Sequence, residues 1–218
     1  MTKKKIIYLL LIAILLIGAF IAFNLYQKIY GSNTSKKGFV YLKTNANFDD
    51  LREVLSPFVK NINSFNTVAE LKKFTKPKAG KYLIKKGLSN NELVNMLRNG
   101  NQIPVKLAFN NQHTLANLAG RISQQIEADS ISLLNAFTDK NFLSKIKFTQ
   151  AESLGLYIPN SYQINWNTSA EKFRDKMYKE YQKFWNNSRL AKAKKLNLSS
   201  KEVMTVASIV QKETAKIK

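Results

Sequence analysis

The chain begins with a long apolar run. Residues 6–23 read IIYLLLIAILLIGAFIAF, with no charge and no proline. An α-helix rises 1.5 Å per residue, so about 20 residues span a hydrocarbon core of roughly 30 Å. Tyr26 suits the aromatic belt at a membrane surface, and Lys28 carries the first charge beyond the run. The pattern predicts a cytoplasmic tail over 1–5 and a transmembrane helix over 6–26.

A cleaved secretory signal peptide is the alternative interpretation of this run. The run is longer than the usual apolar core of a signal, and the stretch FIAFNLYQ offers no clean pair of small residues for cleavage. We therefore favour a retained single-pass anchor in the cytoplasmic (inner) membrane, with the N-terminus inside. Both interpretations send the bulk of the chain to the periplasmic or extracytoplasmic side.

A polar linker at 27–37 separates the apolar run from a region of short strand and helix patterns. Strand-like alternation is found at 38–42, 80–84 and 104–109, and helical spacing at 48–58, 68–74 and 88–97. The last of these helices opens with the capping-box residues Ser89 and Glu92 and ends at Gly100. Strands and short helices within about 70 residues predict a small α+β module over 38–110.

The second half of the chain, 111–218, is mainly helical in pattern. Helical spacing is found at 115–126, 131–137, 170–184 and 201–216. We therefore predict an α+β protein that consists of a transmembrane helix, a small α+β module and a mainly helical domain.

Composition excludes several kinds of chemistry. The chain has no cysteine, which excludes disulfides, thiolate metal sites and a cysteine nucleophile. His113 is the only histidine, so a zinc site or a Ser-His-Asp triad would have to be built around it. A polar loop or helix-entry residue is the simpler role for His113.

The charge balance is strongly basic. The chain carries 35 Lys and Arg against 14 Asp and Glu, a formal net charge of +21. Such a charge favours anionic surroundings, namely nucleic acid, anionic lipid or an anionic cell-wall polymer. Lysine greatly outnumbers arginine and no nucleic-acid-binding module is recognisable, so we expect no nucleic-acid partner.

The C-terminal helix carries the strongest chemical indication. Ser199 and Glu202 form a capping box, and apolar residues then follow one helical face at Val203, Val206, Ala207 and Val210. Glu213 continues this face. A carboxyl group that loses water favours its protonated form, as a general acid in glycoside cleavage requires. Alternatively, Glu213 turns to solvent or pairs with Lys216 or Lys218.

Three segments resemble the YceG-like family of endolytic murein transglycosylases. The run TVASIVQKET at 205–214 resembles the family signature A-S-I-[VI]-[EQ]-x-E. The run GLYIPNSYQINWNTSAEKF at 155–173 resembles the family segment E-G-Y-L-F-P-D-T-Y and the helix after it. The stretch 78–109 resembles the small LysM-like module of that family. These matches cover nearly the whole chain in the expected order.

The resemblance implies roles for particular residues. Glu213 matches the catalytic glutamate, and Gln211 stands at the other acidic place of the signature, where glutamine is accepted. In the second segment, Leu154 replaces the leading glutamate and Asn160 replaces the aspartate. The implied substrate-binding residues are Tyr157, Asn160, Ser161, Tyr162 and Gln211. For those around Pro159, packing and turn formation is an equal alternative.

The activity implied by the resemblance is cleavage of the bond between N-acetylmuramic acid and N-acetylglucosamine in peptidoglycan, leaving 1,6-anhydro ends. One carboxyl acting as acid and then as base needs no metal and no cofactor. The implied partners are peptidoglycan glycan strands, inner-membrane lipids and peptidoglycan synthases. Family members continue beyond this signature, so we expect 111–218 to be the first part of the catalytic domain.

Two other functions remain open at this stage. A non-enzymatic scaffold would bind peptidoglycan through the α+β module and dock a membrane partner through the helical half. A membrane-tethered nucleic-acid binder would use the basic charge, and it predicts that the chain lies in the cytoplasm.

Overall fold

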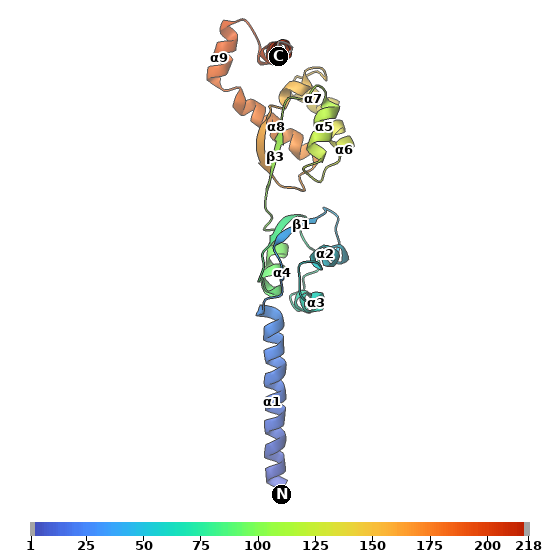
Figure 1. Cartoon of the computed structure of the whole chain (residues 1–218). Helices are drawn as coiled ribbons and strands as arrows, with labels where there is room; N and C mark the ends of the chain where they lie inside the picture. Colours follow the sequence, from blue (N-terminus) through green and yellow to red (C-terminus); the bar gives the residue numbers. More distant parts are fainter. Residues whose placement is uncertain (1–2, 216–218) are drawn as a thin grey trace. The chain divides into compact units, whose positions relative to one another are not determined.

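The computed structural model describes residues 3–215, and the chain divides after Ile103 into two compact units. We call residues 1–103 unit 1 and residues 104–218 unit 2, and each is described by itself (Figure 1). Each unit contains one two-stranded antiparallel sheet packed with helices. The predicted α+β class and the N-terminal apolar helix are confirmed.

Helix α1 (Lys3–Tyr30) is apolar on all sides. Its candidate membrane span is Ile7–Tyr30, and none of the most apolar part is buried against protein. The large apolar side chains between Ile7 and Phe23 expose 53–70% of their surface. A helix that is apolar all round and uncovered by protein has the character of a membrane span.

Unit 1 continues with β1 (Gly38–Leu42), α2 (Phe48–Leu55), α3 (Ile62–Leu71), β2 (Gly80–Ile84) and α4 (Asn90–Asn99). Strand β1 pairs with β2 so that Gly38 faces Ile84 and Leu42 faces Gly80. Alternate strand residues and one face of each helix form a core that includes Val40, Leu51, Phe65, Tyr82, Leu93 and Leu97. The predicted capping box of α4 forms, and Gly100 ends the helix in the left-handed conformation at φ 73°.

The segment 27–37, predicted as a polar linker, is hydrogen-bonded to other parts of unit 1. Residues 27–30 extend α1, while Asn33 and Thr34 are 6% and 1% exposed. The Asn33 amide donates to Asn90 Oδ1 at 2.7 Å, and the Thr34 hydroxyl donates to the Lys85 carbonyl at 2.7 Å. Buried polar groups that are fully hydrogen-bonded hold a segment in one conformation. We call residues 31–37 the strap.

The predicted strand at 104–109 forms as β3 (Val105–Phe109), but it belongs to unit 2. It pairs antiparallel with β4 (Asn160–Ile164), from Val105 opposite Ile164 to Phe109 opposite Asn160. The Phe109 ring stacks on Tyr162 at 5.8 Å, and Leu107 is fully buried in the same core. Because the apolar side chains of β3 pack in the core of unit 2, the division between the units lies after Ile103 rather than after residue 110.

Unit 2 is mainly helical, as predicted. Its helices are α5 (Leu115–Ser123), α6 (Ser130–Phe137), α7 (Lys140–Lys145), the 3₁₀ helix η1 (Ser153–Leu156), α8 (Ala170–Phe184), α9 (Asn187–Lys195) and α10 (Ser200–Ala215). One cluster of buried residues joins β3, β4 and these helices, with Phe137, Phe173 and Ile122 among its fully buried members.

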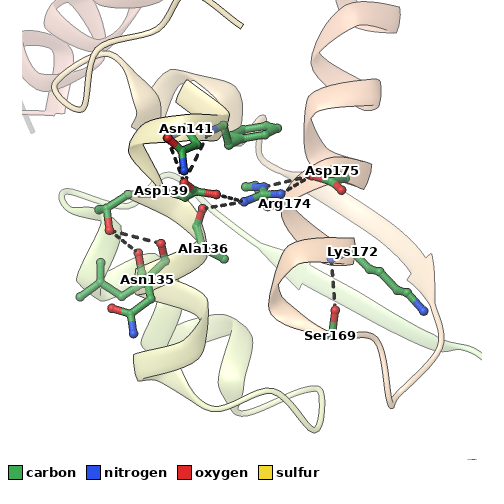
Figure 2. Close-up of polar contacts among 11 residues, drawn as sticks. Asn135, Ala136, Asp139, Asn141, Ser169, Lys172, Arg174 and Asp175 are labelled. Carbon is green, nitrogen blue, oxygen red and sulfur yellow. Dashed lines mark hydrogen bonds and ion pairs between the residues drawn. The ribbon is translucent and has the colours of Figure 1, made fainter. Parts of the chain in front are cut away.

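A buried arginine joins α8 to the corner between α6 and α7 (Figure 2). The Arg174 guanidinium donates to Asp139 at 3.0 Å and to Asp175 at 2.8 and 3.0 Å. Asp139 is also the N-cap of α7, and the guanidinium lies 3.9 Å from the centre of the Phe142 ring. The planar guanidinium can serve two carboxylates and an aromatic face at once. This network joins α8 to the start of α7 within unit 2.

Candidate active-site cleft

Unit 2 contains a cleft of about 510 Å³ between the loop after β3 and helix α10. Its apolar lining is supplied by Phe109, Leu118, Phe148, Met204 and Ala207, among others. Polar side chains from the loop, from the region before η1 and from α10 complete the wall. Apolar surface combined with a few polar groups is typical of a ligand site, and the volume lies within the usual range of about 300–1,000 Å³.

The loop between β3 and α5 forms one wall. Its four consecutive residues Asn110, Asn111, Gln112 and His113 all line the cleft. Thr114 directly after them caps α5 by accepting a hydrogen bond from the Asn117 N–H at 3.0 Å. His113 is therefore a helix-entry residue, as predicted, and it lies in a row of amide side chains that can bond hydroxyl and acetamido groups.

The opposite wall is one face of α10. Lys201, Thr205, Ser208, Gln211 and Lys212 line the cleft at helical spacing. The side-chain amide of Asn111 donates to Gln211 Oε1, so the two walls meet at this pair. Gln211 is thus a cleft residue.

An ion pair closes the end of the cleft near the start of α10. Lys201 Nζ lies 3.0 Å from Glu152 Oε2 and 4.5 Å from the centre of the Phe148 ring. Glu152 also accepts hydrogen bonds from the Thr149 N–H at 2.8 Å and its hydroxyl at 3.0 Å. The Thr149 N–H, followed by Lys201, holds the pKa of Glu152 below its usual value. Glu152 is therefore a carboxylate at neutral pH.

Tyr157 and Tyr162 belong to the core of unit 2 more than to its surface. Tyr157 contributes to the cleft lining but is 5% exposed, and its ring stacks on Phe173. Tyr162 is 8% exposed, and its hydroxyl donates to the Ile158 carbonyl at 2.5 Å. Burial raises the pKa of Tyr162 to about 12. The packing alternative stated for these two tyrosines is therefore favoured.

Asn160 and Ser161 open strand β4 and are exposed. The Asn160 side chain accepts from the N–H of Ser161 at 2.7 Å, which is a local turn contact. Neither residue lines the cleft, so the structure brings together Tyr157 and Gln211 but not Asn160, Ser161 or Tyr162.

Glu213 does not lie on a buried stripe, and that expectation was wrong. Val206 and Val210 expose 47% and 55% of their surface, and Glu213 is exposed as well. Helix α10 packs on unit 2 through its N-terminal half, where Val203 and Met204 contact the core. Side chains two positions apart on an α-helix point about 200° apart around its axis. Glu213 therefore lies nearly opposite Gln211 and outside the cleft lining.

Several cleft residues were not predicted as site residues, among them Asn111, Glu152 and Lys201. Glu152 lies two positions before Leu154, the residue that stands where the family segment has its leading glutamate. Its pairing with Lys201 joins residues 49 positions apart, and the Asn111–Gln211 contact joins residues 100 positions apart. Such contacts leave no signal in local periodicity.

The model of the YceG-like family matches residues 40–218. This chain belongs to the YceG-like family. The matched region contains all of β2 to α10, including both walls of the cleft and the signature at 205–214.

Two curated relatives come from Streptococcus pneumoniae, serotype 2 strain D39 and strain R6, and each is called an endolytic murein transglycosylase. Each is 28% identical over 96% of this chain, which spans 43% of the relative's length. The chain thus spans less than half of these relatives. A crystal structure of the yceG-like protein lmo1499 from Listeria monocytogenes has 23% identity and a TM-score of 0.48, covering 82% of this chain and 64% of that one.

Proposed function

We propose that this chain belongs to a membrane-anchored endolytic peptidoglycan lytic transglycosylase. One observation supports the proposal most directly. The cleft is lined by both polar and apolar side chains, and one of its walls is α10, the helix that contains the family signature. The names of the two streptococcal relatives support the reaction class.

In this proposal the cleft binds a glycan strand. The amide side chains of Asn111 and Gln211 bond sugar hydroxyl and acetamido groups, and Phe109 and Phe148 supply apolar surface for sugar rings. Glu213, the proposed acid, lies on the exposed face of α10 outside the lining of this cleft.

The chemical step needs one carboxyl group. Glu213 protonates the glycosidic oxygen between N-acetylmuramic acid and N-acetylglucosamine, and the sugar passes through an oxocarbenium-like transition state. The resulting carboxylate takes the proton of the muramic acid C6 hydroxyl, and O6 attacks the anomeric carbon. One C–O bond breaks, one forms, and the proton passes from O6 to the leaving oxygen.

We further propose that unit 1 combines the membrane anchor with the LysM-like module, with the bulk of the chain extracytoplasmic. Helix α1 and its candidate span both end at Tyr30, and Ile29 in the last turn packs against the core of unit 1. A helix whose end belongs to the folded core supports a retained anchor over a removed signal.

The test uses the purified chain with isolated peptidoglycan and counts anhydro-ended glycans by mass spectrometry. We expect Glu213→Gln to lower their release by about 10²–10⁴-fold, the usual contribution of a general acid–base group. The matched control is Glu202→Gln on the same helix, because glutamine can also complete the capping box. Equal release by Glu213→Gln and the unchanged chain would exclude Glu213 as the catalytic acid.

The exposure of Glu213 favours a second candidate function, a non-enzymatic peptidoglycan-binding scaffold. In that case the chain sediments with peptidoglycan but releases no anhydro ends. Glu213→Gln then leaves sedimentation unchanged.

A further inference from the structure

The end of unit 1 next to α1 is built around the strap. The backbone N–H groups of Asn33 and Thr34 donate to the Leu88 carbonyl at 2.9 and 3.1 Å, and the Lys60 N–H donates to the Asn33 carbonyl at 2.6 Å. The Gly87 N–H donates to the Thr34 carbonyl at 3.1 Å. Two segments distant in sequence, 56–64 and 85–91, are thereby held beside the residues that follow α1.

The last turn of α1 is bound to the same end. Asn90, which is fully buried, donates from its side-chain amide to the Lys28 carbonyl at 2.9 Å, and Ile29 packs against the core. Helix α1 contacts both α3 and α4. The membrane helix and this end of unit 1 therefore form one piece.

This end is basic, and the acid at its border is Glu92, whose carboxylate accepts hydrogen bonds from the Ser89 N–H and hydroxyl at 2.8 and 2.7 Å. Segments 24–37, 56–64 and 85–91 contain no Asp or Glu. Their lysines are all exposed and are Lys28, Lys36, Lys37, Lys60, Lys85 and Lys86. We call these six lysines the basic collar.

Several collar lysines are held close to the exit of α1. Lys60 Nζ donates to the Ser32 carbonyl at 3.1 Å, two residues after Tyr30. The Lys85 carbonyl accepts from the Thr34 hydroxyl, four residues after Tyr30. Charges within about 10 Å of a lipid surface still act on its headgroups at physiological salt.

We propose that the basic collar binds the anionic phosphodiester headgroups of membrane phospholipids. The inference rests on the proposed insertion of α1 but not on the transglycosylase reaction. Membrane lipid is the occupant because the collar surrounds the point where the candidate span Ile7–Tyr30 ends. The lysine ammonium groups pair with phosphate oxygens, while the strap keeps the charges at a fixed height.

The experiment places the full chain in nanodiscs of mixed phosphatidylcholine and phosphatidylglycerol and counts the retained lipids by native mass spectrometry. We expect the chain to retain phosphatidylglycerol over phosphatidylcholine by about fivefold or more, and salt at about 0.5 M to reduce this preference. Replacing Lys28, Lys60, Lys85 and Lys86 with Gln should bring the ratio to about one.

The matched control replaces four exposed lysines of unit 2, namely Lys179, Lys192, Lys194 and Lys195, with Gln. It removes the same charge and should keep the lipid preference. A second collar variant changes Lys28, Lys36, Lys85 and Lys86 and leaves the Lys60–Ser32 bond intact, so that a loss of preference cannot come from a disturbed strap. An unchanged preference in both collar variants, or an equal loss in the control, overturns the proposal.

The same experiment separates this proposal from the anchor on which it rests. If α1 does not insert, the chain is not recovered with the nanodiscs. If it inserts but shows no preference for anionic lipid, the anchor stands and the collar proposal is refuted.

Discussion

Helices α1 and α10 both expose large apolar side chains, but they do so in different ways. The apolar side chains of α1 lie on all sides of the helix, and only its last turn joins a core. Helix α10 has a polar face in the cleft and an apolar face with Val206, Ile209 and Val210 about half exposed. An all-round apolar surface suits lipid, whereas a one-sided stripe suits contact with another polypeptide surface.

The largest expected difference between the two helices is their response to a charge placed at the centre of each. Leu15→Arg should oppose insertion of α1 by about 2.5–3.5 kcal/mol, the usual cost of arginine at the middle of a span. Ile209→Arg in α10 should leave membrane recovery unchanged, because this position is outside the span. Extraction of isolated membranes with carbonate measures both variants. Equal recovery of Leu15→Arg and the unchanged chain would contradict a lipid-facing α1.

A second prediction concerns how the end of α1 is held. Asn90→Ala removes the amide that joins the Lys28 carbonyl and Asn33, and it leaves buried polar atoms without partners. We expect a loss of about 1–3 kcal/mol in the free energy of unfolding of unit 1. Chemical denaturation followed by circular dichroism measures it, with exposed Asn99→Ala on the same helix as the control. A loss as small as that of the control would mean that the strap is weakly held.

A third prediction concerns how the start of α10 is held. The Tyr181 hydroxyl donates to Ser200 Oγ at 2.9 Å. Tyr181→Phe keeps the ring but should weaken the docking of α10 by about 0.5–1.5 kcal/mol. The weaker docking would be seen as amide hydrogen exchange that Tyr181→Phe accelerates more in α10 than in α8, relative to the unchanged chain. Tyr178→Phe, which also keeps its ring, is the control, and identical exchange in both variants would contradict the prediction.

The smallest expected effect is a pH dependence at the cleft. The pKa of Glu152 is lowered in the folded chain by the Thr149 N–H and Lys201. The stabilisation is therefore complete above the unfolded-state pKa of about 4.5 and is lost as pH falls through the lower folded-state value. Since Glu152 is partly exposed, we expect a change below about 1 kcal/mol. Denaturation at pH 6 and pH 3 should show a smaller pH effect in Glu152→Gln.

The sequence predicts those features that depend on neighbouring residues. The capping box at Ser89 and Glu92, the extent of α8 and the apolar character of α1 follow from local patterns, and all three are found. The signature at 205–214 also indicated the family before the fold was known.

Features that depend on distant partners were not predicted. Residues 31–37 have a polar composition, yet Asn33 and Thr34 are buried because residues 60, 85, 88 and 90 supply their hydrogen bonds. Strand β3 alternates in a way that fits either unit, and its pairing with β4 and the stacking of Phe109 on Tyr162 assign it to unit 2. The stripe on α10 obeys helical periodicity, which says nothing about whether a second element covers it.

The strap has a mechanical consequence. Asn33 is buried only three residues after Tyr30, so no flexible segment separates α1 from the rest of unit 1. One residue inserted within α1 would rotate residues 31–103 by about 100° around the helix axis, relative to the N-terminal part of α1. It would also shift them by about 1.5 Å along that axis. The length of α1 therefore sets the rotational orientation of the folded part of unit 1 about the helix axis. This orientation is defined relative to any partner that binds the sides of α1.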